Sequence, residues 1–179
     1  MDRFEIEQVL ESFRVIVDTR EQASIRATER FAALGDGLER ATLDYGDYAA
    51  NITLMAGNPL YDVAAARIYP SCIIERKMSL DELATCFTRG RDRFRREMER
   101  AASNGSTVYL LVENATYEGI IKHRYRSRFS PSAFLASLTA WTVRYNLRPI
   151  FCKADTSGQL IKEILYRDMK ERLERGEYG

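Results

Sequence analysis

The chain contains 179 residues, of which 45% are hydrophobic and 30% are charged, and its formal net charge is +1. This composition excludes a disordered or fibrous chain, and the length favours one folded domain over residues 1–179, with a core at about 14–170. No apolar run approaches the roughly eighteen residues of a membrane-spanning helix and no signal-peptide pattern opens the chain, so we expect an intracellular protein without a membrane partner, in the cytoplasm or nucleoid, or in the nucleus of a eukaryote.

The first half of the chain predicts one helix among several strands. A β-branched run at 14–18 ends on Asp18 and predicts a buried strand that leads into a polar loop. Helical spacing follows over 24–34. Alternating or β-rich segments separated by glycine and proline turns then predict a meander of strands at 40–45, 48–55, about 60–68 and 71–77.

The second half alternates helices and strands. Ser79 and Glu82 form a capping-box pattern that predicts a short helix over 79–86. The remaining elements are helices at 88–102, 117–121, 130–145 and about 155–173, and strands at 107–113 and 148–152. Together the two halves predict an α/β fold, with a mixed β-sheet flanked by helices.

The cysteine and histidine content limits the kinds of metal site. Cys72, Cys86 and Cys152 are far apart with no Cys-x-x-Cys pair, as suits reduced thiols, and His123 is the only histidine. A structural zinc site cannot be assembled from these residues. Any metal must therefore be held by oxygen ligands.

Carboxylates and a lysine gather at the predicted strand ends. Glu75 and Lys77 are two residues apart on one strand, so their side chains share a face while Arg76 points to the other. Asp47 follows a glycine turn in the same meander, and a neighbouring strand can bring it beside Glu75. Such a set suits a hard divalent cation, and Asp18 at the end of a separate strand is a further candidate ligand.

Phosphodiester hydrolysis requires these groups. We assign Asp47 and Glu75 as principal metal ligands and Lys77 as the group that positions or activates water, because cation and lysine together offset transition-state charge. Supporting catalytic residues are Asp18, Glu21 and Asp81, with Arg76 contacting either a structural carboxylate or DNA. Taken alone, Glu-Arg-Lys on a strand is more often a solvated edge. The apolar residues around it favour a role instead.

The chain resembles the nuclease domain of the XPF family of structure-specific endonucleases. The family signature is Gly-Asp, then Glu-Arg-Lys and an Asp four residues after the Lys, present here as Gly46-Asp47, Glu75-Arg76-Lys77 and Asp81. An upstream Val-Asp-x-Arg-Glu element is matched by Val17-Asp18-Thr19-Arg20-Glu21. The gap between Asp47 and Glu75 is longer than the family's, which suggests an added hairpin, and we expect no tandem helix-hairpin-helix module.

The resemblance implies a restriction-endonuclease-like core of the PD-(D/E)xK type. It implies magnesium or manganese as cofactor, cleavage of branched or junction-containing DNA such as flaps and forks, and pairing of two copies. A separate DNA-binding or helicase partner is a further expectation. Two alternatives stay open: a non-catalytic scaffold partner of a nuclease, and a Holliday-junction resolvase with the same core. Degenerate partners lose the Glu-Arg-Lys and Asp positions, which this chain keeps.

Basic segments supply candidate DNA contacts despite the near-neutral total charge. Residues 89–100 contain six arginines against three acids, and residues 122–128 contain four lysines or arginines and no acid. The candidate DNA-binding residues are Arg20, Arg89, Arg91, Arg93, Lys122, Arg124 and Arg126. The apolar face of the helix at 130–145 suits a two-fold dimer contact or the core of the monomer equally.

Overall fold

A computed structural model describes residues 1–21, 25–35 and 37–178 of the chain. In these residues one six-stranded sheet has the order β2-β1-β3-β4-β5-β6. The strands are β1 (Arg14–Asp18), β2 (Leu38–Ala41), β3 (Tyr48–Asn51), β4 (Cys72–Lys77), β5 (Thr107–Glu113) and β6 (Leu147–Cys152).

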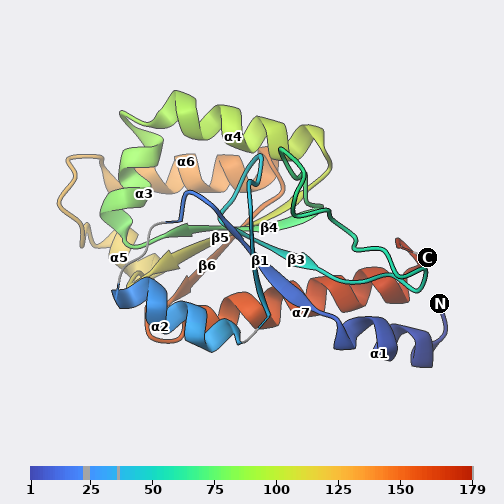
Figure 1. Ribbon diagram of the computed structural model, residues 1–179. Helices are drawn as coiled ribbons and strands as arrows, with labels where there is room; N and C mark the ends of the chain where they lie inside the picture. Colours follow the sequence, from blue (N-terminus) through green and yellow to red (C-terminus); the bar gives the residue numbers. More distant parts are fainter. Residues whose placement is uncertain (22–24, 36, 179) are drawn as a thin grey trace.

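Helices cover both faces of this sheet. In Figure 1, α3, α4 and α6 lie above the sheet, while α2 and α7 lie below it with α1 beside α7. The helices are α1 (Arg3–Glu11), α2 (Ile25–Leu34), α3 (Leu80–Phe87), α4 (Arg91–Ser103), α5 (Tyr117–Ile121), α6 (Pro131–Arg144) and α7 (Ser157–Glu174). None of the helices in the described ranges has the length and hydropathy needed to cross a membrane.

The strand directions are mixed, as expected for this α/β fold. β1 is parallel to β2, and β4, β5 and β6 are parallel to one another. β3 runs antiparallel to both β1 and β4 and so joins the two parallel halves. The end of β1, the start of β3 and the end of β4 therefore meet at one edge of the sheet.

The predicted meander is wrong in its order. β1, α2 and β2 form a strand-helix-strand unit, which places β2 parallel to β1, so that β1 separates β2 from β3. Residues 60–68 are not a strand: those from 62 to 67 are exposed, and Ile68 forms only an isolated bridge with Leu43. Without a buried face, the alternation there does not fix a strand.

Helix α1 was not predicted, although the sequence carries its signal. Asp2 caps the helix by accepting a hydrogen bond from the amide of Glu5, and the Glu5 side chain accepts one from the amide of Asp2. Ile6, Val9 and Leu10 form its buried face. The expected start of α2 at Ser24 lies outside the described residues.

The sheet divides the hydrophobic core into two halves, and residues of β4 belong to both. Ile73 packs with residues of α3, α4 and α6, whereas Ile74 packs with residues of α1 and α7. Alternation along the strand then places Glu75 and Lys77 on the α4 side and Arg76 on the α7 side. Buried charges on both faces of one strand therefore follow directly from the pleat.

The apolar face of α6 belongs to the core on the α4 side. Phe134, Leu138, Trp141 and Tyr145 are all buried in this chain. From the sequence, these side chains suited a dimer contact and the core of the monomer equally. Their burial within the monomer is sufficient to explain them.

Candidate active site

A cleft opens where the end of β4 meets α3 and α4. Its volume is about 360 Å³. Its lining is rich in charged side chains and comprises Arg20, Glu21, Asp47, Glu75, Arg76, Lys77, Glu82, Thr85, Cys86, Gly90, Arg93, Phe94 and Glu97. The structure thus brings together Asp47, Glu75 and Lys77, the three residues given principal roles from the sequence.

Backbone hydrogen bonds to two strands hold Asp47. Its amide donates to the carbonyl of Ile74 at 2.8 Å, and its carbonyl accepts from the amide of Asp18 at 2.9 Å. The preceding Gly46 has a φ of +77°, and a Cβ there would lie 2.7 Å from the Ile73 side chain. A glycine at this turn therefore lets the Asp47 segment pack closely against β4.

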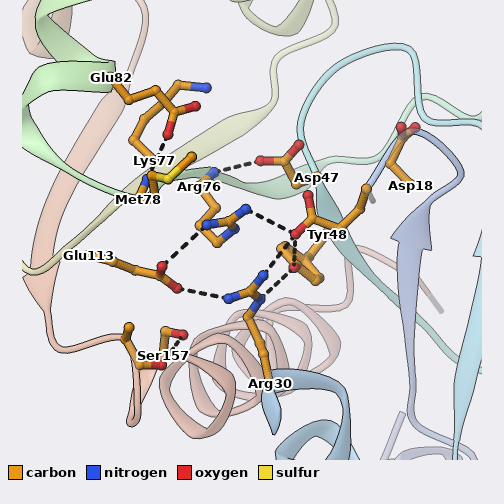
Figure 2. A network of polar contacts seen from close by, with 12 residues as sticks. Asp18, Arg30, Asp47, Tyr48, Arg76, Lys77, Met78, Glu82, Glu113 and Ser157 are labelled. Carbon is orange, nitrogen blue, oxygen red and sulfur yellow. Dashed lines mark hydrogen bonds and ion pairs between the residues drawn. The ribbon is translucent and has the colours of Figure 1, made fainter. Parts of the chain in front are cut away.

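The Asp47 carboxylate is fixed by the neighbouring strand. Its Oδ2 accepts a hydrogen bond of 2.7 Å from the backbone amide of Arg76, as Figure 2 shows. Since Arg76 lies between Glu75 and Lys77, this bond sets Asp47 against both residues of the α4 face. The expectation that a neighbouring strand brings Asp47 beside Glu75 is thereby met.

Lys77 pairs with Glu75 inside the cleft. Its Nζ donates to Glu75 Oε1 and lies 5.3 Å from the centre of the Phe94 ring. Burial alone would lower the pKa of Lys77, but the Glu75 and Asp47 carboxylates outweigh burial and raise it. Lys77 therefore stays protonated and acts as a donor of hydrogen bonds and positive charge.

The two carboxylates oppose each other's ionisation. Loss of hydration raises the pKa of Asp47, and the Glu75 charge raises it further. Loss of hydration also raises the pKa of Glu75, against the opposing effect of Lys77. A divalent cation between the two carboxylates would relieve both effects.

The donor set fits a magnesium-type ion. Within the described ranges, no group of three or more His, Cys, Asp or Glu side chains is arranged to hold a metal. Mg²⁺ keeps several waters and is commonly bound by one or two carboxylates together with substrate phosphates. Asp47 and Glu75, two oxygen donors beside an open cleft, meet that requirement.

Arg76 lies on the opposite face in a buried ionic network. Arg30 and Arg76 each contact both Glu21 and Glu113, at distances of 2.9 to 3.2 Å. Tyr48 completes the group, because its hydroxyl accepts from Arg30 at 2.8 Å and donates to Glu21 at 3.0 Å. Figure 2 shows Arg30, Tyr48, Arg76 and Glu113 grouped around these contacts. We call these five residues the closed network.

The expected metal role of Asp18 does not fit this geometry. Asp18 is 1% exposed, and its two carboxylate oxygens accept bonds from the Arg20 side chain, the Arg20 amide and the Leu43 amide. Arg20, in turn, lines the cleft with its guanidinium held in place. Asp18 is therefore an anchor for Arg20, and Glu21 is occupied within the closed network.

Asp81 also lies elsewhere than expected. Its Oδ1 accepts hydrogen bonds from the amides of Arg126 at 2.6 Å and Ser127 at 3.2 Å. It lines a separate hollow with Arg89 and Arg126. The supporting role of Asp81 at the metal site stays a prediction. In this structure Asp81 anchors residues 122–128, which we call the basic loop.

The candidate DNA-binding residues lie on the surface of the chain. Each is exposed, either on the basic loop, near the start of α4 or at the end of β1, and Arg20 and Arg93 line the cleft itself. They are Arg20, Arg89, Arg91, Arg93, Lys122, Arg124 and Arg126.

Sequence reasoning missed three residues of this region: Arg30, Glu97 and Glu113. Glu113 ends a buried strand, as Asp18 does, so the same signal could have identified it. Arg30 and Glu97 lie within helices, where a charged residue ordinarily faces solvent. Nothing in the local pattern distinguishes these two from surface charges.

The sequence of the site region also matches a known family. A family model described as the ERCC4 domain matches residues 17–164. The chain belongs to the ERCC4 domain family. The match spans every residue of the cleft and confirms the resemblance to XPF nucleases.

Solved structures agree with the assignment to the ERCC4 domain family. XPF from Aeropyrum pernix is 22% identical, with a TM-score of 0.58 over 87% of this chain and 61% of that chain. The same protein in complex with DNA is 26% identical, with a TM-score of 0.58 over 88% of this chain and 65% of that chain. The chain thus spans less than two thirds of these relatives and shares their fold. No protein with a curated description matches it.

Proposed function

We propose that the chain is a DNA endonuclease that requires Mg²⁺ or Mn²⁺ and hydrolyses phosphodiester bonds in branched DNA. The observation that carries this proposal is the arrangement of Asp47, Glu75 and Lys77 in one cleft. Membership of the ERCC4 domain family supports nuclease activity, and one of the similar solved structures is a complex of XPF with DNA. Homodimer formation, a helicase partner and an intracellular location stay predictions.

Asp47, Glu75 and Lys77 would have distinct parts in the proposed reaction. Asp47 and Glu75 would hold the divalent cation. When bound, the cation would supply Lewis-acid activation at the scissile phosphate. Lys77, protonated beside two carboxylates, would orient the attacking water and offset the negative charge that develops on the phosphate.

Arginines at the rim would hold the DNA backbone. Arg20 is held by Asp18 at 2.6 Å and by the carbonyl of Leu43 at 2.9 Å, so little side-chain entropy is lost on binding a phosphate. Arg93 is exposed on the α4 wall of the same cleft. A phosphate that enters the cleft would therefore meet Arg20 and Arg93 before it reaches Asp47 and Glu75.

A cleavage assay tests the proposed function. Labelled flap, fork, four-way junction and linear duplex DNA would be incubated with the protein in Mg²⁺, in Mn²⁺ or in chelator. We expect metal-dependent cleavage of the branched substrates, and loss of cleavage with Asp47→Asn or Glu75→Gln. Glu163→Gln, an exposed substitution on α7, is the matched control and should cut normally. Absence of cleavage by the wild-type protein on every substrate would contradict the proposal.

A further inference from the structure

One face of α4 forms a wall of the cleft. Gly90 at the start of the helix, then Arg93, Phe94 and Glu97, line it at the spacing of a single helical face. Phe94 lies over the Lys77 ammonium, and Glu97 follows one turn later. Glu97 therefore lines the cleft from the same face of α4 as Phe94, which packs on Lys77.

Glu97 is bonded to the segment that carries Asp47. Its Oε1 accepts a hydrogen bond of 3.1 Å from the amide of Gly46, the residue before Asp47. Gly46 has no side chain to hold its position, and its backbone already lies close to Ile73. The bond to Glu97 thus ties this turn to a helix 51 residues later in the sequence.

The charge of Glu97 acts on Arg20 across the cleft but is not neutralised by a direct ion pair among the described residues. Asp92 and Glu99, on the same helix, pair with Arg95 at the surface. In the part of the chain that the structure describes, no lysine or arginine forms an ion pair with Glu97. Its charge also contributes to the raised pKa of Glu75, after burial. Glu97 thus adds negative charge beside the carboxylates of Asp47 and Glu75.

Glu82 provides a contrast within the same cleft. Its Oε2 accepts from the amide of Met78 at 2.8 Å, so it closes the start of its own helix. That bond is local and needs no cleft to explain it. The bond of Glu97 joins two elements far apart in the sequence, at the residue next to Asp47.

We infer that Glu97 is a positioning residue of the active site: it holds Asp47 in place through the Gly46 amide, and its charge strengthens the binding of the divalent cation. This inference rests on the proposed function. It assigns two separable roles to one carboxylate, the acceptor of a hydrogen bond and the source of a charge.

Two substitutions separate these roles. Glu97→Gln keeps an oxygen that can accept from Gly46 but removes the charge, whereas Glu97→Ala removes both. Glu99→Gln removes a carboxylate from the same helix outside the cleft and is the matched control. The measurements are calorimetric titration of the whole protein with Mn²⁺ in the absence of DNA, and the unfolding temperature without metal.

We expect Mn²⁺ affinity to fall about tenfold in both Glu97 variants, the size of effect found for residues that support metal ligands. The unfolding temperature should fall by roughly 2–4 °C only in Glu97→Ala, since the Gly46 amide loses its partner there. Glu99→Gln should leave both quantities unchanged.

Three results would overturn the inference in different ways. Wild-type affinity in Glu97→Gln would show that the charge has no part in metal binding. Failure of the wild-type protein to bind Mn²⁺ would overturn the proposed function itself, and the inference with it. Unchanged affinity and unchanged unfolding temperature in Glu97→Ala would exclude both roles.

Discussion

Two groups of buried charges lie on opposite faces of β4, and they are balanced differently. The closed network sets Arg30 and Arg76 against Glu21 and Glu113, so its charges cancel. On the other face, the carboxylates of Asp47, Glu75 and Glu97 outnumber the ammonium of Lys77, and we call these four residues the acidic cleft. Arg20 and Arg93 line the same hollow.

This difference distinguishes a structural use of buried charge from a functional one. Every acid in the closed network has a cation in contact, and the network ties α2 to the central strands. In the acidic cleft, burial and mutual repulsion raise the pKa of Asp47, so the folded chain holds its carboxylate at a cost in stability. Sites that bind cations commonly have this unbalanced charge.

The largest effect is expected from breaking the closed network. Glu113→Gln leaves Arg30 and Arg76 without one of their two acids in a buried site, and the free energy of unfolding should fall by about 3–5 kcal/mol. Urea denaturation measures this change in the free energy of unfolding. Glu163→Gln, which removes an exposed pair with Arg167, should cost less than about 1 kcal/mol. Equal, small losses in the two variants would contradict the assigned structural role.

The acidic cleft should respond in the opposite way. Asp47→Asn removes a carboxylate whose ionisation is disfavoured, so without metal the free energy of unfolding should rise at neutral pH. Cleavage of branched DNA should fall at least about 100-fold, because a metal ligand is lost. If the Asp47→Asn variant were less stable than wild type and fully active, Asp47 would have a structural role like that of the closed network.

The pH dependence of stability sharpens the same contrast. Because the folded-state pKa of Asp47 is raised, its neutral form stabilises the fold at low pH, and that contribution is lost as the pH rises above about 4 and through the raised pKa. Asp47→Asn cannot ionise, so its stability does not fall in this way as the pH rises. Its advantage in metal-free stability over wild type should therefore grow with pH, at up to about 1.4 kcal/mol per unit. A difference that is constant from pH 4 to 8 would contradict the raised pKa.

The smallest expected effect concerns Asp81, which belongs to neither group of charges. Asp81→Asn weakens the anchoring of the basic loop, so affinity for branched DNA should fall about fivefold, while Mn²⁺ binding stays at the wild-type level. Fluorescence anisotropy with labelled DNA measures the first quantity and calorimetry the second. A loss of Mn²⁺ affinity with intact DNA binding would support the expected metal role of this residue.

The sequence predicted the cleft better than the sheet around it. Strand periodicity and the Glu-Arg-Lys spacing were sufficient to place Glu75 and Lys77 on one face and Arg76 on the other. The order of the strands was not predictable from local pattern, because the β1-α2-β2 unit inserts β1 between two segments that look consecutive.

Long-range pairing accounts for the remaining differences. Arg30 and Glu113 are 83 residues apart, and no local pattern reports their contact. The roles of Asp18 and Asp81 likewise depend on the amides that face them, which only the folded chain brings together. Residue type identified these acids as functional candidates, whereas their hydrogen-bond partners assign them to anchoring roles.

Diffraction from crystals grown with Mn²⁺, recorded with anomalous signal, tests the central claim most directly. We expect an anomalous peak in the cleft within coordination distance of both Asp47 and Glu75, and its disappearance in Asp47→Asn. A peak bound by Asp18 or Asp81, or a cleft without a peak in a protein that cuts DNA, would contradict it.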